Sequence, residues 1–260
     1  MQKVLLIASL LPLLGCSPDQ ANDDNNHKAQ ALVTSSEYST VGYPESQVQR
    51  KPIKMSQKKL LDVPLIKQNP ELKYGCEVTS LAMMLQYAGV ETTKWQLYEK
   101  IVKDNDPLIK SRDGDILKWG NPARGFVGDM TGTQAGYAVF DEPMIDLINR
   151  YLPRSGVNLT GKDFNEVLRH VSDGYPVVVW TTGDYRVPDR WESWQHGNEQ
   201  IETPLDLHAV VIVGYDERSV YINDPLSGKK QVQVNKEQFI SSWEALEKRA
   251  VSFRIQIPST

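Results

Sequence analysis

The chain has 260 residues, of which 40% are hydrophobic, and a formal net charge of −4. This length suits a domain with a substantial buried core. The acidic balance and the lack of a basic cluster argue against nucleic acid as a partner.

The N-terminus, MQKVLLIASLLPLLGC, has one lysine followed by a short apolar run from Val4 to Leu14. This run is too short to span a bilayer but fits the apolar segment of a signal peptide. Its ending, LLGC at positions 13–16, resembles the lipobox of bacterial lipoproteins, where cleavage precedes a cysteine that is lipidated on sulfur. We therefore expect a lipoprotein signal peptide at residues 1–15 and an exported chain, anchored to a bacterial membrane through lipid on Cys16. The alternative is an ordinary signal peptide in which the cysteine falls there by chance.

Residues 16–59 are rich in Asn, Asp, Gln, Ser and Lys and contain few apolar residues. Such a segment cannot bury enough surface to offset its ordering entropy, which predicts a flexible tether behind the lipidated cysteine. Apolar residues return at Leu60 and no linker-like break follows, so we expect one folded domain over residues 60–258. If Cys16 carries lipid, the mature chain keeps one free thiol, that of Cys76.

Amphipathic helices are predicted in the first half of the domain. Apolar residues recur at helical spacing over residues 77–88, after Thr93, after Asp141 and over residues 160–172. Cys76 is therefore expected at the N-terminus of the first helix.

The second half contains β-branched and apolar runs, which predict strands over residues 176–181, 208–215, 219–223, 230–234 and 250–257. Asn235 is expected to cap an intervening helix. Because helices come first and strands later, the pattern predicts an α+β fold with N-terminal helices packed on an antiparallel β-sheet. Two long irregular stretches, 111–140 and 183–206, are expected to be loops that wall or cover a site.

Cys76 is the candidate nucleophile. A helix N-terminus lowers the pKa of a cysteine because the helix dipole favours negative charge there, and the thiolate is the reactive form. The charge of the adjacent Glu77 opposes a thiolate. A free cysteine is otherwise a small hydrophobic residue that packs in a core, so a catalytic role requires a cationic partner.

The four histidines supply the candidates for that partner. His27 lies in the tether, His170 is expected at a solvated position on a helix, and His196 lies in a tryptophan-rich stretch that could cover a site. His208 begins a strand that is apolar on both faces, so it either faces a cleft or is satisfied within the core. We take His208 as the candidate base.

Asp224 ends the strand that follows His208 along the chain. A turn centred near residues 216–217 would place Asp224 directly opposite His208, with both side chains on one face of the sheet. Asp224 could then orient His208, as the third member of a catalytic triad does. Asn223 would face the other way unless a bulge intervenes, and the simpler interpretation of the Asp-Pro pair at 224–225 is a turn.

Stabilisation of an oxyanion needs hydrogen-bond donors. Gln68 lies on the loop that leads into the first helix, and its amide could join the main-chain N–H of Cys76 in that role. Asn69 is the competing donor, and a surface glutamine without a catalytic role is the alternative.

Taken in chain order, these four residues resemble the catalytic set of the C39-like cysteine peptidases, within the papain-like superfamily: Gln68, Cys76, His208 and Asp224. The segments VPLIKQNPELKYGCEVTSLAMMLQYAG, HAVVIVGYDERSVYINDP and WGNPARGFVGD are similar to the stand-alone branch of that family. The resemblance covers about residues 60–257 and implies a papain-like fold and a peptide or protein substrate, with no metal and no cofactor. Members fused to exporters usually carry Cys-Gly at the nucleophile and cleave after a double glycine. Glu77 follows Cys76 here, so that specificity is not carried over.

The leading hypothesis is therefore thiol-dependent hydrolysis of peptide bonds at the cell envelope, by a chain expected to be a monomer. One alternative is a cell-wall amidase or endopeptidase of the NlpC/P60 kind, whose usual Asp-Cys-Ser context this chain lacks. Another is a catalytically inactive lipoprotein that binds a peptide or glycan through its aromatic loops. The sequence contains no HExxH, GxSxG or P-loop pattern, which argues against metalloprotease, serine hydrolase and nucleotide-binding functions.

Overall fold

The computed structural model describes residues 55–255. The predicted signal peptide at residues 1–15, Cys16 and the tether up to residue 54 lie outside the described residues. The expected domain boundary at residue 60 stays a prediction. Within residues 55–255, no helix is both long and apolar enough to cross a membrane.

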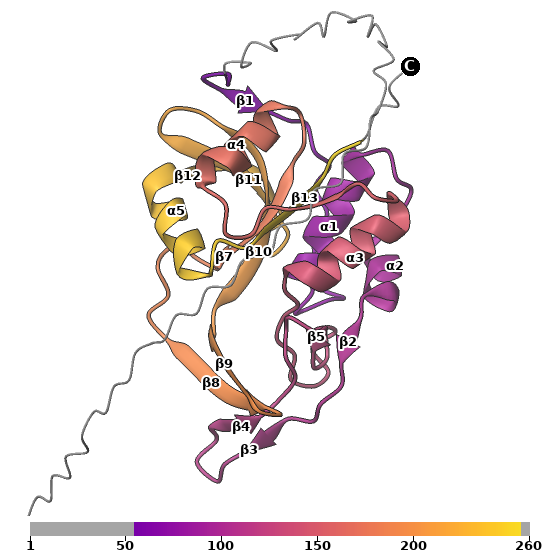
Figure 1. The fold of residues 1–260 in the computed structure, drawn as a ribbon, viewed down its shortest axis with the longest axis vertical. Helices are drawn as coiled ribbons and strands as arrows, with labels where there is room; N and C mark the ends of the chain where they lie inside the picture. The colour runs from indigo at the N-terminus through magenta and orange to yellow at the C-terminus, as the bar shows by residue number, and fades with distance from the viewer. Residues whose placement is uncertain (1–54, 256–260) are drawn as a thin grey trace, which may run out of the picture. The chain divides into compact units, whose positions relative to one another are not determined.

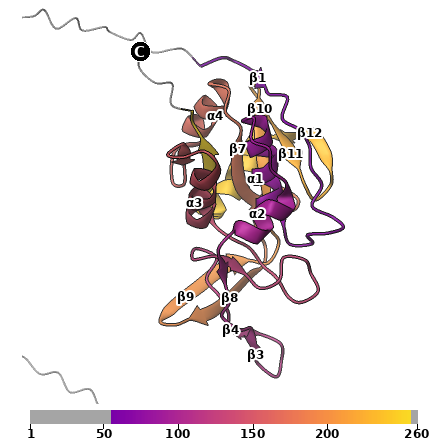
Figure 2. The same cartoon turned by 90° about the vertical axis from the view of Figure 1, so that its right-hand side faces the viewer.

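Figures 1 and 2 show the helices and strands from two directions. The first part of the chain contains β1 (Lys59–Leu60), α1 (Cys76–Tyr87), α2 (Lys94–Lys100), β2 (Lys103–Asp104), β3 (Ile109–Lys110), β4 (Ile116–Lys118), β5 (Phe126–Val127), α3 (Asp141–Tyr151), β6 (Gly156–Asn158) and α4 (Phe164–Ser172). The second part contains β7 (Val177–Thr182), β8 (Trp191–His196), β9 (Glu199–Pro204), β10 (Leu207–Tyr215), β11 (Ser219–Asp224), β12 (Lys229–Asn235), α5 (Lys236–Ala245) and β13 (Ala250–Phe253).

The main sheet has seven strands in the order β12-β11-β10-β7-β13-β6, with β1 paired to β10. Every pairing in it is antiparallel. β7 and β10 are buried almost throughout, as expected for apolar strands in the middle of a sheet with helices on both faces. The predicted α+β architecture with an antiparallel sheet is confirmed.

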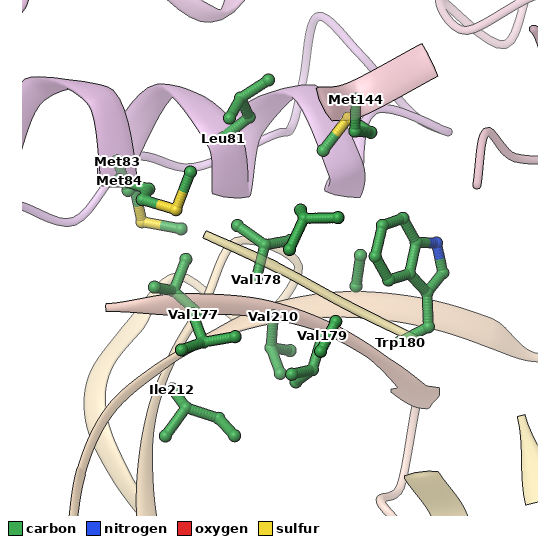
Figure 3. Packing of buried hydrophobic residues seen from close by; sticks show 14 of the residues in the cluster. Leu81, Met83, Met84, Met144, Val177, Val178, Val179, Trp180, Val210 and Ile212 are labelled. Atoms are coloured by element: carbon green, nitrogen blue, oxygen red, sulfur yellow. The ribbon is translucent and has the colours of Figure 1, made fainter. Parts of the chain in front are cut away.

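The core lies between this sheet and α1. Ten of the twelve residues of α1 are buried, because the helix is apolar or small on nearly every side. Figure 3 shows Leu81 and Met84 of α1, with Met144 of α3, above Val178 and Trp180 of β7. α1 and α3 lie on one side of the sheet and α5 on the other (Figure 1). This packing sets the N-terminus of α1, and with it Cys76, against β10.

Several predicted helix ends agree closely with the structure, but the helix expected over 160–172 begins only at Phe164. The helix expected over 77–88 spans Cys76–Tyr87. Thr93 caps α2 through a capping box with Gln96, and Asn235 caps α5 by accepting a hydrogen bond from the Gln238 N–H at 3.0 Å. These caps follow from local chemistry, because a side-chain oxygen at the first position satisfies an N–H group that the helix leaves free.

The stretch 183–206, expected to be irregular, instead contains the β8–β9 hairpin. Its strands pair antiparallel from Trp191↔Pro204 to His196↔Glu199. The hairpin joins β3 and β4 in a four-stranded sheet that lies beyond the helices at one end of the domain (Figure 2). The prediction failed because these strands contain many polar residues and few β-branched or aliphatic ones, so the apolar pattern that identifies a strand is weak.

His170 is not at a solvated position, as the sequence suggested. It is buried on α4, and its Nε2 atom lies 2.9 Å from the carbonyl oxygen of Phe253. Burial lowers the pKa of this imidazole, against the effect of that hydrogen bond. His170 therefore belongs to the core between α4 and β13.

Candidate active site

Cys76 is the first residue of α1, as predicted. Its N-cap, Gly75, provides no side-chain cap for the helix. A side chain at position 75 would bring its Cβ within 2.5 Å of the Cβ of Leu72, so glycine is needed for the chain to enter the helix here. The thiol is 6% exposed and lies at the helix end, where main-chain N–H groups favour negative charge.

The surroundings of the Cys76 thiol favour its protonated form, although the thiol lies at a helix N-terminus. Its Sγ donates a hydrogen bond to Glu77 Oε2 at 3.3 Å. Burial, and after it the charge of Glu77, raise the pKa of the thiol well above its usual value, while the main-chain N–H of Ala209 acts in the opposite direction. The arrangement is that of a resting thiol rather than a preformed thiolate.

Glu77 is itself a buried acid. Its side chain is fully buried, and its Oε1 accepts a hydrogen bond from the Val139 N–H at 3.1 Å. Burial raises the pKa of this carboxyl group to about 7, although the Val139 bond lowers it. The sequence indicated that Glu77 opposes a thiolate, but not that it is buried or that it holds the segment before α3.

His208 and Asp224 form a buried pair. The His208 Nε2 atom lies 2.7 Å from Asp224 Oδ1, and both side chains are 4% exposed. Burial alone would raise the pKa of Asp224, but the hydrogen bond and positive charge of His208 hold it well below its usual range. Because Nε2 is engaged by Asp224, the ring presents Nδ1 as the nitrogen for a second partner.

The predicted register between these two residues was wrong, although their contact forms. In the structure Val211 pairs with Asn223 and Ile212 with Ile222, with a bulge before Gly214. Continued to His208, this register makes residue 226 its opposite position, so Asp224 lies two residues before that position and opposite Val210. Residues two apart on a strand share a face, so the two side chains still meet diagonally.

Asn223 faces away from this pair, as expected. Its amide donates to the carbonyl oxygens of Val63 and Pro64 at 3.0 and 3.3 Å, and its Oδ1 accepts from the Gln231 N–H at 3.0 Å. Asn223 therefore holds the segment that contains Val63 and Pro64 against the sheet.

Gln68 is buried next to the Asp224 turn, whereas its competitor Asn69 is exposed. The Gln68 main-chain N–H donates to the Pro225 oxygen at 3.0 Å. Its side-chain Nε2 donates to the Lys73 oxygen at 2.8 Å, and its Oε1 is buried without a partner among residues 55–255. Gln68 thus links the loop before Cys76 to the loop after Asp224, and its oxyanion role stays a prediction.

Tyr185 is a part of the site that the sequence did not reveal. Its hydroxyl donates to Asp224 Oδ2 at 2.9 Å, while the Leu226 N–H donates to Asp224 Oδ1 at 2.8 Å. Burial, and then the charge of Asp224, raise the pKa of this tyrosine. Tyr185 lies in the stretch interpreted as a loop, where no residue pattern points to a carboxylate.

The four predicted residues converge at one end of β10. Ser80 of α1 donates to the Ala209 oxygen at 3.1 Å, which holds the first turns of α1 against the residue that follows His208. The main chain of the same residue acts to lower the pKa of the Cys76 thiol, which places the sulfur near it. The structure thus places a thiol, an imidazole held by a carboxylate, and a buried amide around the start of one strand.

Known proteins resemble this chain over most of the described domain. A model of the Peptidase_C39 like family matches residues 60–251. YvpB, an uncharacterised protein of Bacillus subtilis (strain 168), is 38% identical over 195 residues, which cover 74% of this chain and 75% of YvpB. A solved structure from Bacillus anthracis, assigned to the C39-like peptidases, is 40% identical with a TM-score of 0.70, covering 77% of this chain and 99% of that one.

These matches span the described domain and include α1, β10 and β11, which carry Cys76, His208 and Asp224. They confirm the resemblance stated from the sequence. The chain belongs to the Peptidase_C39 like family.

Proposed function

We propose that this chain is a cysteine peptidase in which Cys76 is the nucleophile. The observation that carries the proposal is the buried 2.7 Å contact between His208 and Asp224, beside the helix N-terminus that bears Cys76. A carboxylate that fixes one imidazole nitrogen leaves the other to act as a base, which is the arrangement thiol and serine hydrolases share.

In the proposed reaction, His208 Nδ1 takes the proton of the Cys76 thiol. The sulfur then attacks the carbonyl carbon of the scissile bond, and the Cys76 N–H with Gln68 Nε2 stabilises the oxyanion. Cleavage of the C–N bond forms a thioester, and His208 gives its proton to the leaving amine. Water, with His208 as base, then hydrolyses the thioester and restores the thiol.

Glu77 opposes the first step of this reaction, the transfer of the thiol proton to His208. The thiol donates to Glu77 in the described state, so the reaction requires the thiol to turn from Glu77 toward His208. We propose that binding of a peptide substrate brings about this change.

We further propose that the protein works at the cell envelope, anchored through lipid on Cys16, on a peptide or protein substrate. The short apolar run that ends in LLGC supports this location. Each buried methylene of an acyl chain adds about 0.8 kcal/mol to membrane binding, so Cys16→Ala should release the chain from membranes. Unchanged partitioning of that variant into the detergent phase, with cleavage still occurring, would exclude the anchor.

Active-site labelling tests the peptidase proposal. The chain is treated with a peptidyl electrophile, and the rate of modification at Cys76 is followed by mass spectrometry in the wild type and in His208→Ala. We expect labelling to slow by at least tenfold in the variant, because the thiol loses its base. Equal, slow labelling of both proteins would favour the inactive binding lipoprotein. Turnover of cell-wall peptides but not of proteins would favour the NlpC/P60-type activity.

A further inference from the structure

A second cluster of chemically active side chains lies where the segment after α2 meets the tip of the β8–β9 hairpin. Asp104 ends β2, Asp106 follows two residues later, and His196 ends β8. The His196 Nε2 atom lies 3.0 Å from Asp104 Oδ2 and 3.3 Å from Asp106 Oδ2. The ligand atoms of the three residues all lie within 4.8 Å of one another.

An ion pair alone does not satisfy this cluster. The side chains of His196 and Asp104 are 10% and 9% exposed. A protonated His196 would have one N–H at Nε2 for two carboxylates, and its Nδ1 is buried without a hydrogen-bond partner among residues 55–255. The Glu199 Oε2 atom lies 3.8 Å from Nδ1, which is beyond hydrogen-bond reach. A buried N–H that lacks an acceptor is unfavourable.

We propose that Asp104, Asp106 and His196 bind a divalent transition-metal ion of the Zn²⁺ class. Zinc lies about 2.0–2.1 Å from a histidine nitrogen and about 2.0–2.2 Å from a carboxylate oxygen, so ligands about 90–110° apart lie roughly 2.8–3.5 Å from each other. Both distances from Nε2 fall in that range. A mixed set of one imidazole and two carboxylates suits Zn²⁺ better than Ca²⁺ or Mg²⁺, which prefer oxygen ligands. Asp106 is 59% exposed, which leaves the solvent side of the ion open to water.

A carboxylate, that of Glu199, lies beside His196 on the side away from the two aspartates. A metal-bound histidine usually donates its other ring N–H to a carboxylate. With Nε2 on the ion, the Nδ1 hydrogen faces Glu199, whose Oε2 atom lies 3.8 Å away and would have to move closer to accept it. Two neighbouring side chains bind the Glu199 carboxylate. Glu199 Oε2 accepts from Asn121 Nδ2 at 2.8 Å, and Oε1 accepts from Arg124 at 2.7 Å.

The motif WGNPARGFVGD, which the proposed reaction does not use, builds this site. The Asn121 N–H donates to Asp104 Oδ2 at 3.0 Å. A Cβ at Gly120 would lie 3.1 Å from the Asp104 carboxyl group, and one at Gly125 would lie 2.7 Å from the Asp104 main-chain nitrogen. The two glycines and the asparagine therefore make room for Asp104 and orient it.

The ion would join two segments that are about ninety residues apart in the chain, from β2 to the hairpin tip. β9 leads from that hairpin into β10, whose second residue is His208. The metal is therefore assigned a structural role, which is to fasten the hairpin and steady the strand that carries the candidate base. This role does not depend on the proposed peptidase activity.

Metal titration of the full chain tests the proposal. The parent protein carries Cys16→Ala and Cys76→Ala, so that neither thiol binds the ion, and it has no polyhistidine tag. After treatment with a chelator and its removal, Zn²⁺ is titrated by calorimetry and the Tm is measured with and without excess Zn²⁺. The same measurements are made on Asp104→Asn and His196→Gln, with Asp113→Asn as the matched control because Asp113 is exposed on a neighbouring turn.

We expect one Zn²⁺ per chain in the parent and in Asp113→Asn, a rise in Tm with excess Zn²⁺, and at least tenfold weaker binding in both cluster variants. In chelator, the cluster variants should unfold close to the parent, because they lose a ligand rather than a stabilising ion pair. No saturable binding by the parent would overturn the proposal, as would binding that survives in Asp104→Asn. Variants that are destabilised equally with and without Zn²⁺ would show a plain ion pair instead. A response to Ca²⁺ but not Zn²⁺ would overturn the assigned metal class.

Discussion

Glu77 is an unusual neighbour for a nucleophilic thiol. It is fully buried, accepts the thiol hydrogen of Cys76, and is held by the Val139 N–H. Because burial raises its pKa to about 7, this carboxyl group titrates near neutral pH. Its protonation state therefore affects both the stability of the domain and the charge beside Cys76.

Stability should depend on pH through Glu77. Its pKa is about 7 in the folded protein against an ordinary value of 4.5, so the folded state binds more protons between these two values. The free energy of unfolding should therefore fall as pH rises from about 4.5 to 7, by about 3 kcal/mol from this group. Glu77→Gln removes this effect, because glutamine keeps an oxygen for the Val139 N–H and does not titrate.

Urea unfolding of both proteins at pH 5 and pH 8 measures this prediction. The wild type should lose stability relative to Glu77→Gln between the two values, and parallel changes would contradict it. The same variant should alkylate faster at Cys76 near pH 7, because an amide donor near sulfur favours the thiolate that a carboxylate opposes.

Asp224 is expected to act by orienting His208, and Tyr185 by orienting Asp224. Asp224→Ala should lower kcat by about 10²-fold or more, since the imidazole loses the partner that fixes its tautomer. Asp224→Asn should retain more activity, because an amide oxygen can still accept from Nε2. Tyr185→Phe removes one hydrogen bond and should lower kcat by about two- to tenfold.

Tyr221→Phe is the matched control for Tyr185→Phe, because the Tyr221 hydroxyl donates to Asp216, away from the site. Steady-state kinetics and Tm are measured for all four variants on a substrate that the wild type cleaves. If Tyr185→Phe behaves like Tyr221→Phe, Tyr185 has no positioning role. If Asp224→Ala keeps full activity, the assignment of Asp224 is wrong.

Single residues were predictable where local chemistry decides their place. Cys76 at a helix start and Asn235 at a cap follow from neighbours within four residues in the chain. Tyr185 could not be found, because its contact with Asp224 joins residues 39 positions apart through a turn that has no sequence signal of its own. The burial of His170 was missed for a similar reason, since its partner Phe253 lies on the last strand.

At the scale of elements, the bulge in β10 explains how β1 joins the main sheet. β1 pairs with Gly214 and Tyr215, just beyond the irregularity in the β10–β11 pairing. A Cβ at position 214 would lie 2.5 Å from the Lys59 oxygen and 2.8 Å from Leu60 Cδ1. The glycine therefore permits the close approach of β1, and the bulge makes that approach compatible with the β11 pairing.

Gly214→Ala should consequently displace β1 and cost about 1–3 kcal/mol, as overpacking of a tight contact does. Gly183→Ala serves as the control, because a Cβ there meets no atom within 4 Å. In thermal unfolding, the Tm of Gly214→Ala should be several degrees lower than that of Gly183→Ala. Equal Tm values would mean that β1 adapts to the added methyl group without loss.

Elements differed in how well the sequence predicted them. Strands such as β7 are apolar along their length, so composition alone identifies them. The β8–β9 hairpin has few aliphatic residues, and its one usable signal was the Gly197-Asn198 turn, where Gly197 has φ of 58°. The register of β10 and β11 could not be predicted, because the bulge places one extra residue in β10 and so shifts the pairing on its far side by one residue.

For the whole molecule, the start of the folded domain can be tested by truncation. The Tyr215 hydroxyl donates to the Ser56 oxygen at 2.9 Å, so Ser56 contributes to the domain although it precedes the boundary expected from composition. A chain that begins at Met55 should unfold at nearly the temperature of the full chain. A chain that begins at Gln57 should lose about 0.5–1.5 kcal/mol, the net contribution of one hydrogen bond. A large loss in both chains would mean that earlier residues pack on the domain.

The position of β13 determines when folding can be completed. This strand, Ala250–Phe253, is the last one within residues 55–255, yet it lies inside the main sheet between β7 and β6. β6 has no other neighbour in that sheet, so a nascent chain that has not yet released residue 250 cannot place it. Long-range pairing of this kind delays folding until synthesis is nearly finished. If the chain is exported N-terminus first, as we propose, its sheet closes only after β13 has crossed the membrane.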